Sequence, residues 1–152
     1  AESGAWRNYY LAAAATLRGT AIENVTGNGQ SRSFVSAIPT SVFFDALATR
    51  FDAEKGAALN GTFQFVLPDS KETVAVVVGG GVEVPRYGVT AAAPTATVTL
   101  DRKTLDDVML GQAQFPALMQ SGAIRIEGDT MAFLSWFALH SPADPRFNVV
   151  VP

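Results

Sequence analysis

Residues 124–140, with the sequence IRIEGDTMAFLSWFALH, limit what this chain can fold into. The segment begins with the alternation of a strand, turns at Gly128-Asp129 and continues with helical spacing. Within residues 130–139 only Thr130 and Ser135 are polar, so the predicted helix is apolar on every side. Such a helix is expected to be buried all round. One sheet face hides half of it, so something else must cover the other half.

A β-rich block in the middle of the chain predicts the sheet. Strands are expected at 62–67, 72–78, 81–87 and 95–100, with a fifth at 122–128, and Gly79, Gly80 and Gly81 suit a hairpin turn. The alternation of threonine with apolar residues in 95–100 indicates one buried and one solvated face. The predicted fold class is therefore α+β, with a five-stranded, mostly antiparallel sheet and helices covering one face.

Helical spacing and capping residues predict the remaining elements. Helices are expected at 5–18, before the C-cap Gly19, and at 40–51, begun by Thr40 or Ser41. Further helices are expected at 102–111 after Asp101, at 115–120, and at 130–139 after Asp129 or Thr130. Residues 26–33 are polar and turn-rich and predict a loop, and residues 147–151 predict a final extended piece.

Composition excludes several classes of function. The net charge of -3 and the pI of about 5.0 do not favour binding to nucleic acids or anionic membranes. No apolar run approaches the roughly 18 residues of a membrane span, so no stable membrane insertion is expected. The chain has no cysteine and one histidine, which leaves only all-oxygen metal sites, and no calcium-type loop is present. No metal and no cofactor are predicted.

Two sequence features could suggest chemistry. His140 could serve in a catalytic triad, but no Gly-x-Ser-x-Gly motif accompanies it, and a histidine at a helix end interacts favourably with the helix dipole. The glycines 79–81 could cradle a phosphate, but a strand-like segment follows them where a helix would be needed. No catalytic residue is predicted.

Several segments together resemble the C-terminal region of bacterial alkyl sulfatases. They are RNYYL (7–11), TLRG (16–19), SVFFDALATRFDAEKGA (41–57), ATVTLDRKTLDDVMLG (96–111), SGAIRIEGDTMAFLSWF (121–137) and FNVVVP (147–152). The resemblance covers most of the chain and rests on structural motifs. It implies a sterol-carrier-protein-type-2-like fold with a five-stranded sheet and an apolar ligand tunnel.

The resemblance also implies a larger parent enzyme. In such enzymes a separate metallo-β-lactamase-like domain with two zinc ions cleaves the sulfate ester, and a helical dimerisation region precedes the tail domain. This sequence lacks the His-x-His-x-Asp-His zinc motif, so it is expected to be a fragment or a stand-alone relative. Because RNYYL looks like the end of the dimerisation region, residues 1–19 are expected to be its tail and 20–152 the sterol-carrier-like domain. A periplasmic or secreted location is expected from the same family.

The leading hypothesis is a non-catalytic domain that binds aliphatic chains of alkyl sulfates, fatty alcohols or lipids. Met109, Met119 and Met131 all fall in the last third of the chain, and methionine suits irregular apolar cavities. Apolar spacing then predicts the ligand-binding residues, which are Phe43, Leu47, Phe51, Met109, Leu118, Met119, Phe133, Trp136 and Phe137.

The second side of the apolar helix could also be covered by protein, in either of two ways. Another helix of the same domain, such as 41–51, could pack against it, since most apolar clusters are core. Alternatively the chain is an interaction module whose apolar surface docks on a metallo-β-lactamase-like catalytic domain or on a second copy.

Overall fold

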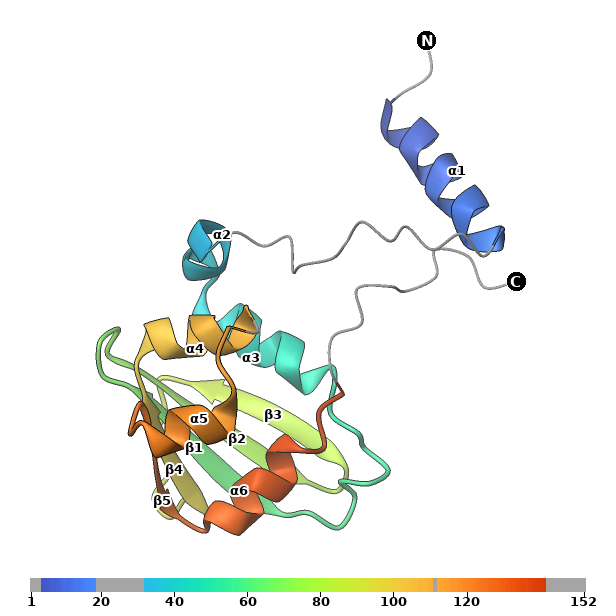
Figure 1. Cartoon of the computed structure of the whole chain (residues 1–152). Coiled ribbons are helices and arrows are strands. Elements are labelled where there is room, and N and C mark those ends of the chain that lie inside the picture. Colours follow the sequence, from blue (N-terminus) through green and yellow to red (C-terminus); the bar gives the residue numbers. More distant parts are fainter. Residues whose placement is uncertain (1–3, 19–31, 111, 142–152) are drawn as a thin grey trace. The chain divides into compact units, whose positions relative to one another are not determined.

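A computed structural model of the chain describes residues 4–18, 32–110 and 112–141 (Figure 1). The first of these ranges and the rest belong to two compact units, and each is described by itself. The first contains α1 (Gly4–Leu17), which confirms the helix predicted at 5–18. The rings of Trp6 and Tyr10, one turn apart, stack with centroids 6.1 Å apart.

The second unit is built on one five-stranded sheet, as predicted. The strands are β1 (Gly61–Leu67), β2 (Glu72–Gly79), β3 (Val82–Tyr87), β4 (Ala96–Leu100) and β5 (Ile124–Gly128). Their order in the sheet is β3-β2-β1-β4-β5. Among these strands only the pair formed by the central strand β1 and its neighbour β4 is parallel. The other three pairs are antiparallel.

The parallel pair requires the chain to cross from the β3 edge back to the middle of the sheet. The crossing segment lies against Gln64, whose side chain is buried on the face of β1 opposite Phe63 and Phe65. Gln64 accepts a hydrogen bond from the Ala91 N–H at 2.8 Å and lies 3.3 Å from the Val89 carbonyl oxygen. A buried glutamine therefore supplies the hydrogen bonds that an apolar side chain could not.

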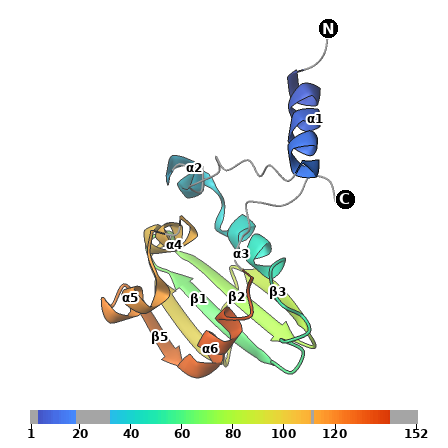
Figure 2. The ribbon, with the colours of Figure 1, turned by 45° about the vertical axis from the view of Figure 1, so that its right-hand side comes forward.

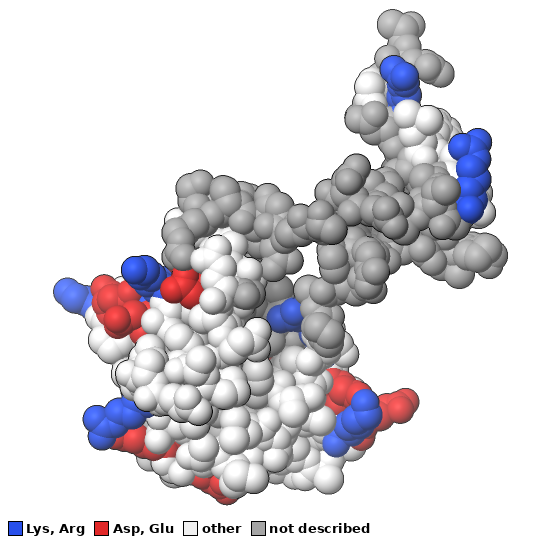
Figure 3. All heavy atoms as spheres, viewed as in Figure 1, with Lys and Arg blue, Asp and Glu red and all other residues white. Residues whose placement is uncertain are grey.

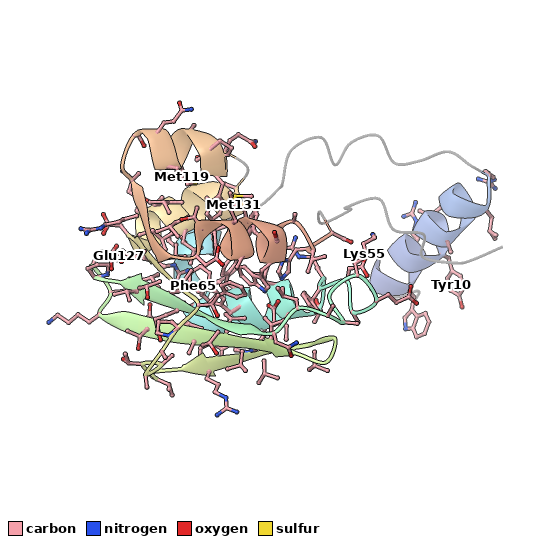
Figure 4. All side chains as sticks on the ribbon, turned by 90° about the horizontal axis from the view of Figure 1, so that it is seen from below. Tyr10, Lys55, Phe65, Met119, Glu127 and Met131 are labelled. Carbon is pink, nitrogen blue, oxygen red and sulfur yellow. The ribbon has the colours of Figure 1, made fainter. Side chains whose placement is uncertain are left out.

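Helices cover the other face of the sheet, as Figure 2 and the edge-on view of Figure 4 show. They are α3 (Thr40–Ala48), α4 (Arg102–Met109), α5 (Phe115–Gln120) and α6 (Thr130–Phe137). Phe65 points from β1 into the layer between sheet and helices (Figure 4). The core of that layer is made of buried side chains from both sides, among them Phe44, Leu47, Phe63, Leu67, Val98, Phe133 and Trp136.

The unit between β5 and α6 forms as the sequence predicts. Gly128 ends the strand with a φ of 94°, and a Cβ there would meet the Thr95 carbonyl oxygen at 2.6 Å, so only glycine fits. The Asp129 carboxylate then accepts a hydrogen bond from the Ala132 N–H at 2.9 Å and caps α6. The hairpin between β2 and β3 is also confirmed, with positive φ at Gly80 and Gly81.

Several boundaries differ from prediction. The helix expected at 40–51 ends at Ala48, so Phe51 lies beyond it. Neither proposed residue caps that helix: Pro39 holds the N-cap position, and the Thr40 hydroxyl donates to Glu72 at 2.7 Å instead. Asp101 precedes α4 without a side-chain capping bond. A helix α2 (Arg32–Ala37) begins within the loop expected at 26–33. Gly19, residues 20–31, Gly111 and the extended piece at 147–151 lie outside the described residues.

The expectation that the last helix is buried all round is wrong. Phe133 and Trp136 are fully buried, but Met131 is 71% exposed and Leu134 is 37% exposed. The sheet and neighbouring side chains cover only the inner side of α6. Apolar residues on the outer side misled the prediction, because helical spacing shows which residues share a side and not whether that side is covered.

Candidate functional site

An apolar cavity lies between the helices and the sheet of the second unit. It is enclosed by side chains from α3, α4, α5 and α6 above and from β1 and β4 below. The lining consists of Phe43, Phe44, Leu47, Phe65, Leu100, Leu105, Val108, Phe115, Trp136 and Phe137. No charged or polar side chain is among them. The cavity volume is about 20 Å³, which is room for about one water molecule.

The structure brings four of the nine predicted ligand-binding residues to this cavity. Phe43 and Leu47 line it from α3, and Trp136 and Phe137 line it from α6. The other five lie around it: Phe133 is fully buried in the core, Leu118 and Phe51 are half-buried against the core, and Met109 and Met119 are half-buried near helix ends. Figure 4 places Met119 and Met131 on the helical side of the sheet.

Aromatic rings form most of the cavity wall. Phe115 of α5 lies 4.4 Å from Phe137 and 5.8 Å from Phe133, measured between ring centroids. The Trp136 indole stacks on Phe63 with centroids 4.9 Å apart. Sequence reasoning did not assign Phe115 or Phe65 to the site. The sequence signal for Phe115 is the apolar start of the short helix at 115–120. The signal for Phe65 is the alternation of side chains along β1.

A buried polar cluster adjoins the cavity, and sequence reasoning missed it. The Trp136 indole N–H donates to Glu83 Oε2 at 2.8 Å, and His140 Nε2 lies 2.9 Å from the same oxygen. The side chains of Glu83 and His140 are only 1% and 4% exposed. The sequence signal for this cluster is Val82-Glu83-Val84 in β3. Because successive side chains of a strand point to opposite faces, either the two valines or Glu83 must point inward.

His140 takes the helix-end position predicted for it. Its Nδ1 lies 3.2 Å from the carbonyl oxygen of Phe137, the last residue of α6. Its ring also faces Phe51, and the two residues form an isolated antiparallel bridge. The histidine therefore ties the end of α6 to the segment after α3. Both ring nitrogens face protein acceptors, which is not the arrangement of a general base open to a substrate.

A larger groove of about 430 Å³ lies near the start of α3, and its lining is mixed. It contains Pro39, Thr40, Ser41, Lys71, Glu72, Thr73, Val74, Tyr87 and Gly88. The Tyr87 hydroxyl lies 2.6 Å from Asp45 Oδ1, and burial, followed by this hydrogen bond, raises the pKa of Tyr87. Hydrogen bonds from Thr40 and then Ser70 lower the pKa of Glu72. These groups already have protein partners, so the groove offers a ligand little unsatisfied polarity.

Within the described residues, no group of three or more histidine, cysteine or acidic side chains could hold a metal ion. In the same parts of the chain no helix is long and apolar enough to cross a membrane. Charged side chains in Figure 3 gather at the margins of the sheet unit, and the middle of the visible helical face is largely uncharged.

Comparison with known proteins connects this arrangement to a family. Residues 28–152 match the family model described as alkyl sulfatase C-terminal. The chain belongs to this family. A linear primary-alkylsulfatase from Pseudomonas sp. is 36% identical over 152 residues, which is 100% of this chain and 23% of the relative. An (R)-specific secondary-alkylsulfatase from Pseudomonas sp. is 30% identical over 151 residues, covering 99% of this chain and 22% of the relative.

Solved structures agree with the family and extend it to a wider fold. A double mutant of a sec-alkyl sulfatase matches 94% of this alkyl sulfatase C-terminal chain and 22% of its own, with a TM-score of 0.78 and 29% identity. Sterol carrier protein 2 matches with a TM-score of 0.50 and 14% identity, over 64% of this chain and 86% of its own. A palmitated sterol carrier protein 2-like protein from Aedes aegypti gives the same TM-score at 20% identity, over 64% and 92%. The fold is therefore sterol-carrier-protein-type-2-like, as the family resemblance implied.

Proposed function

We propose that this alkyl sulfatase C-terminal domain is a non-catalytic domain that binds aliphatic chains. The chains would be those of alkyl sulfates, fatty alcohols or lipids, and the domain would recruit substrate for a separate catalytic domain of a longer alkyl sulfatase. The observation that carries the proposal is the cavity between helices and sheet, because every side chain that lines it is apolar. Similar pockets with few polar groups take ligands whose surface is mainly hydrocarbon.

The relatives support the same class of ligand. The curated relatives are named for alkyl sulfates, and this chain spans less than a quarter of their length. A protein of the same fold has been solved in palmitated form. In its relatives this domain is part of alkylsulfatases, and an apolar cavity there suits the binding of the alkyl part of a sulfate ester.

Binding would require the cavity to widen. Its present volume of about 20 Å³ is too small for an alkyl chain, so covering elements must move outward. The element best suited to move is α5, because none of its residues is fully buried. Burying about ten methylenes would yield roughly 8 kcal/mol gross, and the costs of association and opening leave affinities in the micromolar range or weaker.

Tryptophan fluorescence tests this proposal directly. The chain has two tryptophans, so a Trp6→Phe variant leaves Trp136, which lines the cavity, as the sole reporter. We expect a saturable change on titration with twelve-carbon sulfate or alcohol below the micelle concentration, and none with the two-carbon analogues. If neither the twelve-carbon sulfate nor the twelve-carbon alcohol gives a saturable change, the proposal is contradicted.

Matched variants locate the binding. Val108→Phe adds bulk inside the cavity, whereas Val42→Phe makes the same change on the exposed side of α3. We expect the first variant to weaken binding at least tenfold and the second to leave it unchanged. Equal binding by both variants would place the ligand elsewhere.

A second candidate is an interaction module, favoured by the exposed apolar side chains of α6. Met131 and Leu134 face outward from the helix and would be covered if the domain docked on a catalytic domain or on a second copy. Analytical ultracentrifugation of the wild type and of a Met131→Gln, Leu134→Gln variant tests this function. Self-association of the wild type that the variant loses would favour it.

A further inference from the structure

Glu83 presents a carboxylate to the interior where its strand could have presented valine. On β3 the neighbouring Val82 and Val84 are exposed, and the Glu83 side chain is 1% exposed. A buried carboxylate is strongly unfavourable unless it is paired and hydrogen-bonded. The register of β3 against β2 therefore retains a polar group under α6 in place of two available apolar side chains.

The partners of Glu83 satisfy only one of its two oxygens. Trp136 Nε1 and His140 Nε2 both contact Oε2. Oε1 is also buried, and it has no hydrogen-bond partner among the described residues. The tryptophan is a donor only, so its contact shows that Oε2 is an acceptor.

The role of Oε1 does not depend on where the shared proton lies. His140 Nδ1 faces the Phe137 carbonyl, an acceptor, so we assign a proton to this nitrogen. His140 Nε2 then either donates to a Glu83 carboxylate or accepts from a protonated Oε2. In both arrangements the pair of side chains has no net charge and Oε1 is an acceptor without a donor.

The Glu83 side chain adjoins the apolar cavity through Trp136, which contacts its other oxygen, Oε2. The indole ring lines the cavity, and its N–H points to Glu83. Phe137 also belongs to both places, because its ring lines the cavity and its carbonyl contacts His140. A ligand that enters as α5 moves outward and extends along these two rings would approach the Glu83 side chain.

We propose that Glu83 Oε1 binds the hydroxyl group of a long-chain primary alcohol whose alkyl chain occupies the cavity. This inference rests on the proposed function and selects one class from its ligands. A hydroxyl is a donor that carries no charge, and it supplies the one hydrogen bond that Oε1 lacks. The alcohol is the product that hydrolysis of a primary alkyl sulfate would release. The domain would then hold the released product in preference to the sulfate substrate, which narrows the proposed function to its alcohol ligands.

A sulfate group does not suit this position. It is an acceptor only and would face another acceptor, and its charge would have to be buried with no cationic side chain among the cavity lining. A competing feature is Arg50, whose Nε is buried and has no hydrogen-bond partner within the part of the chain that the structure describes. Arg50 precedes Phe51, which bridges to His140, so it supplies an alternative place for an anionic head group.

A ligand series in the Trp6→Phe background tests the inference. The probes are 1-dodecanol, dodecyl methyl ether, which lacks the donor hydrogen, and dodecyl sulfate. We expect 1-dodecanol to bind roughly tenfold to a hundredfold more tightly than the ether, since an unmet buried acceptor is costly. We expect it to bind more tightly than the sulfate as well.

Two matched substitutions assign the preference to one residue. Glu83→Gln can turn its NH₂ group toward the ligand, and a donor there serves the alcohol and the ether equally. We therefore expect this variant to lose the preference for alcohol over ether while still binding both. Glu127→Gln makes the same change on an exposed residue of β5 and should keep the preference. Circular dichroism confirms that both variants fold.

The outcomes separate the two proposals. If all three compounds bind with equal affinity, or Glu83→Gln keeps the preference, the assignment of Glu83 is overturned and the aliphatic cavity stands. If dodecyl sulfate binds most tightly and Arg50→Gln weakens it, the head group lies at Arg50 and not at Glu83. If none of the three binds, the proposed function fails, and this inference fails with it.

Discussion

Helices α5 and α6 cover the same face of the sheet but are held there very differently. α6 contributes two fully buried rings, Phe133 and Trp136, and is tied to β3 by the hydrogen bond from the Trp136 indole to Glu83. α5 contributes no fully buried residue, and only Phe115 and Leu118 pack against the core. The comparison shows that one side of the cover over the apolar cavity is anchored by fully buried rings and the other side is not, and we expect the proposed ligand to enter on the less buried side.

The largest expected effect comes from removing a ring of α6. Phe133→Ala deletes a fully buried side chain that lies against Phe63, Phe65, Phe115 and Trp136. We expect the free energy of unfolding to fall by about 3–5 kcal/mol, measured by denaturant titration. A loss below about 1 kcal/mol would show that α6 is not the fixed side of the cover.

The matching change in α5 should have a smaller effect. Phe115→Ala removes a half-buried ring, and we expect a loss of about 1–2 kcal/mol because less apolar area leaves the core. Hydrogen exchange should show the amides of α5 opening more readily than those of α6 in the unsubstituted chain. Equal losses for Phe115→Ala and Phe133→Ala, with equal exchange rates, would remove the distinction between the helices.

The smallest effect is expected on the outer side of α6. Met131 is largely exposed, so Met131→Ser should change the free energy of unfolding by no more than about 0.5 kcal/mol in denaturant titration. This contrasts with Phe133, two residues along the same helix. A loss comparable with that of Phe133→Ala would mean that a second surface covers Met131 in solution, as the interaction-module function requires.

Local sequence rules predicted the elements whose determinants are close in the chain. Gly128 and Asp129 mark a strand exit and a helix cap without any tertiary information, and the structure confirms both roles. The buried Ala96, Val98 and Leu100 follow from alternation alone. The helix expected at 40–51 was too long, because Phe51 continues the apolar spacing although the helix ends at Ala48. The backbone of Phe51 instead pairs with His140, which is distant in sequence.

The candidate site was only partly accessible to sequence reasoning. Apolar spacing identifies residues that share a side of a helix, and it placed Phe43, Leu47, Trp136 and Phe137 in the site, which the cavity brings together. It gave no means of ranking Met109 and Met119 against Phe115, because the closeness of two helices depends on the sheet that carries them. It also could not assign a partner to Glu83, since His140 is 57 residues away.

By itself, the sequence determined an α+β domain with five strands and an apolar layer, because periodicity and turn chemistry act over a few residues. The family came from the resemblance of whole segments and not from periodicity. The tertiary structure decided which apolar surfaces meet. It left Met131 exposed, closed the cavity to about 20 Å³, and turned Glu83 inward toward Trp136 and His140. These outcomes depend on strand register and helix placement, which are set by contacts between distant segments and carry no local signature.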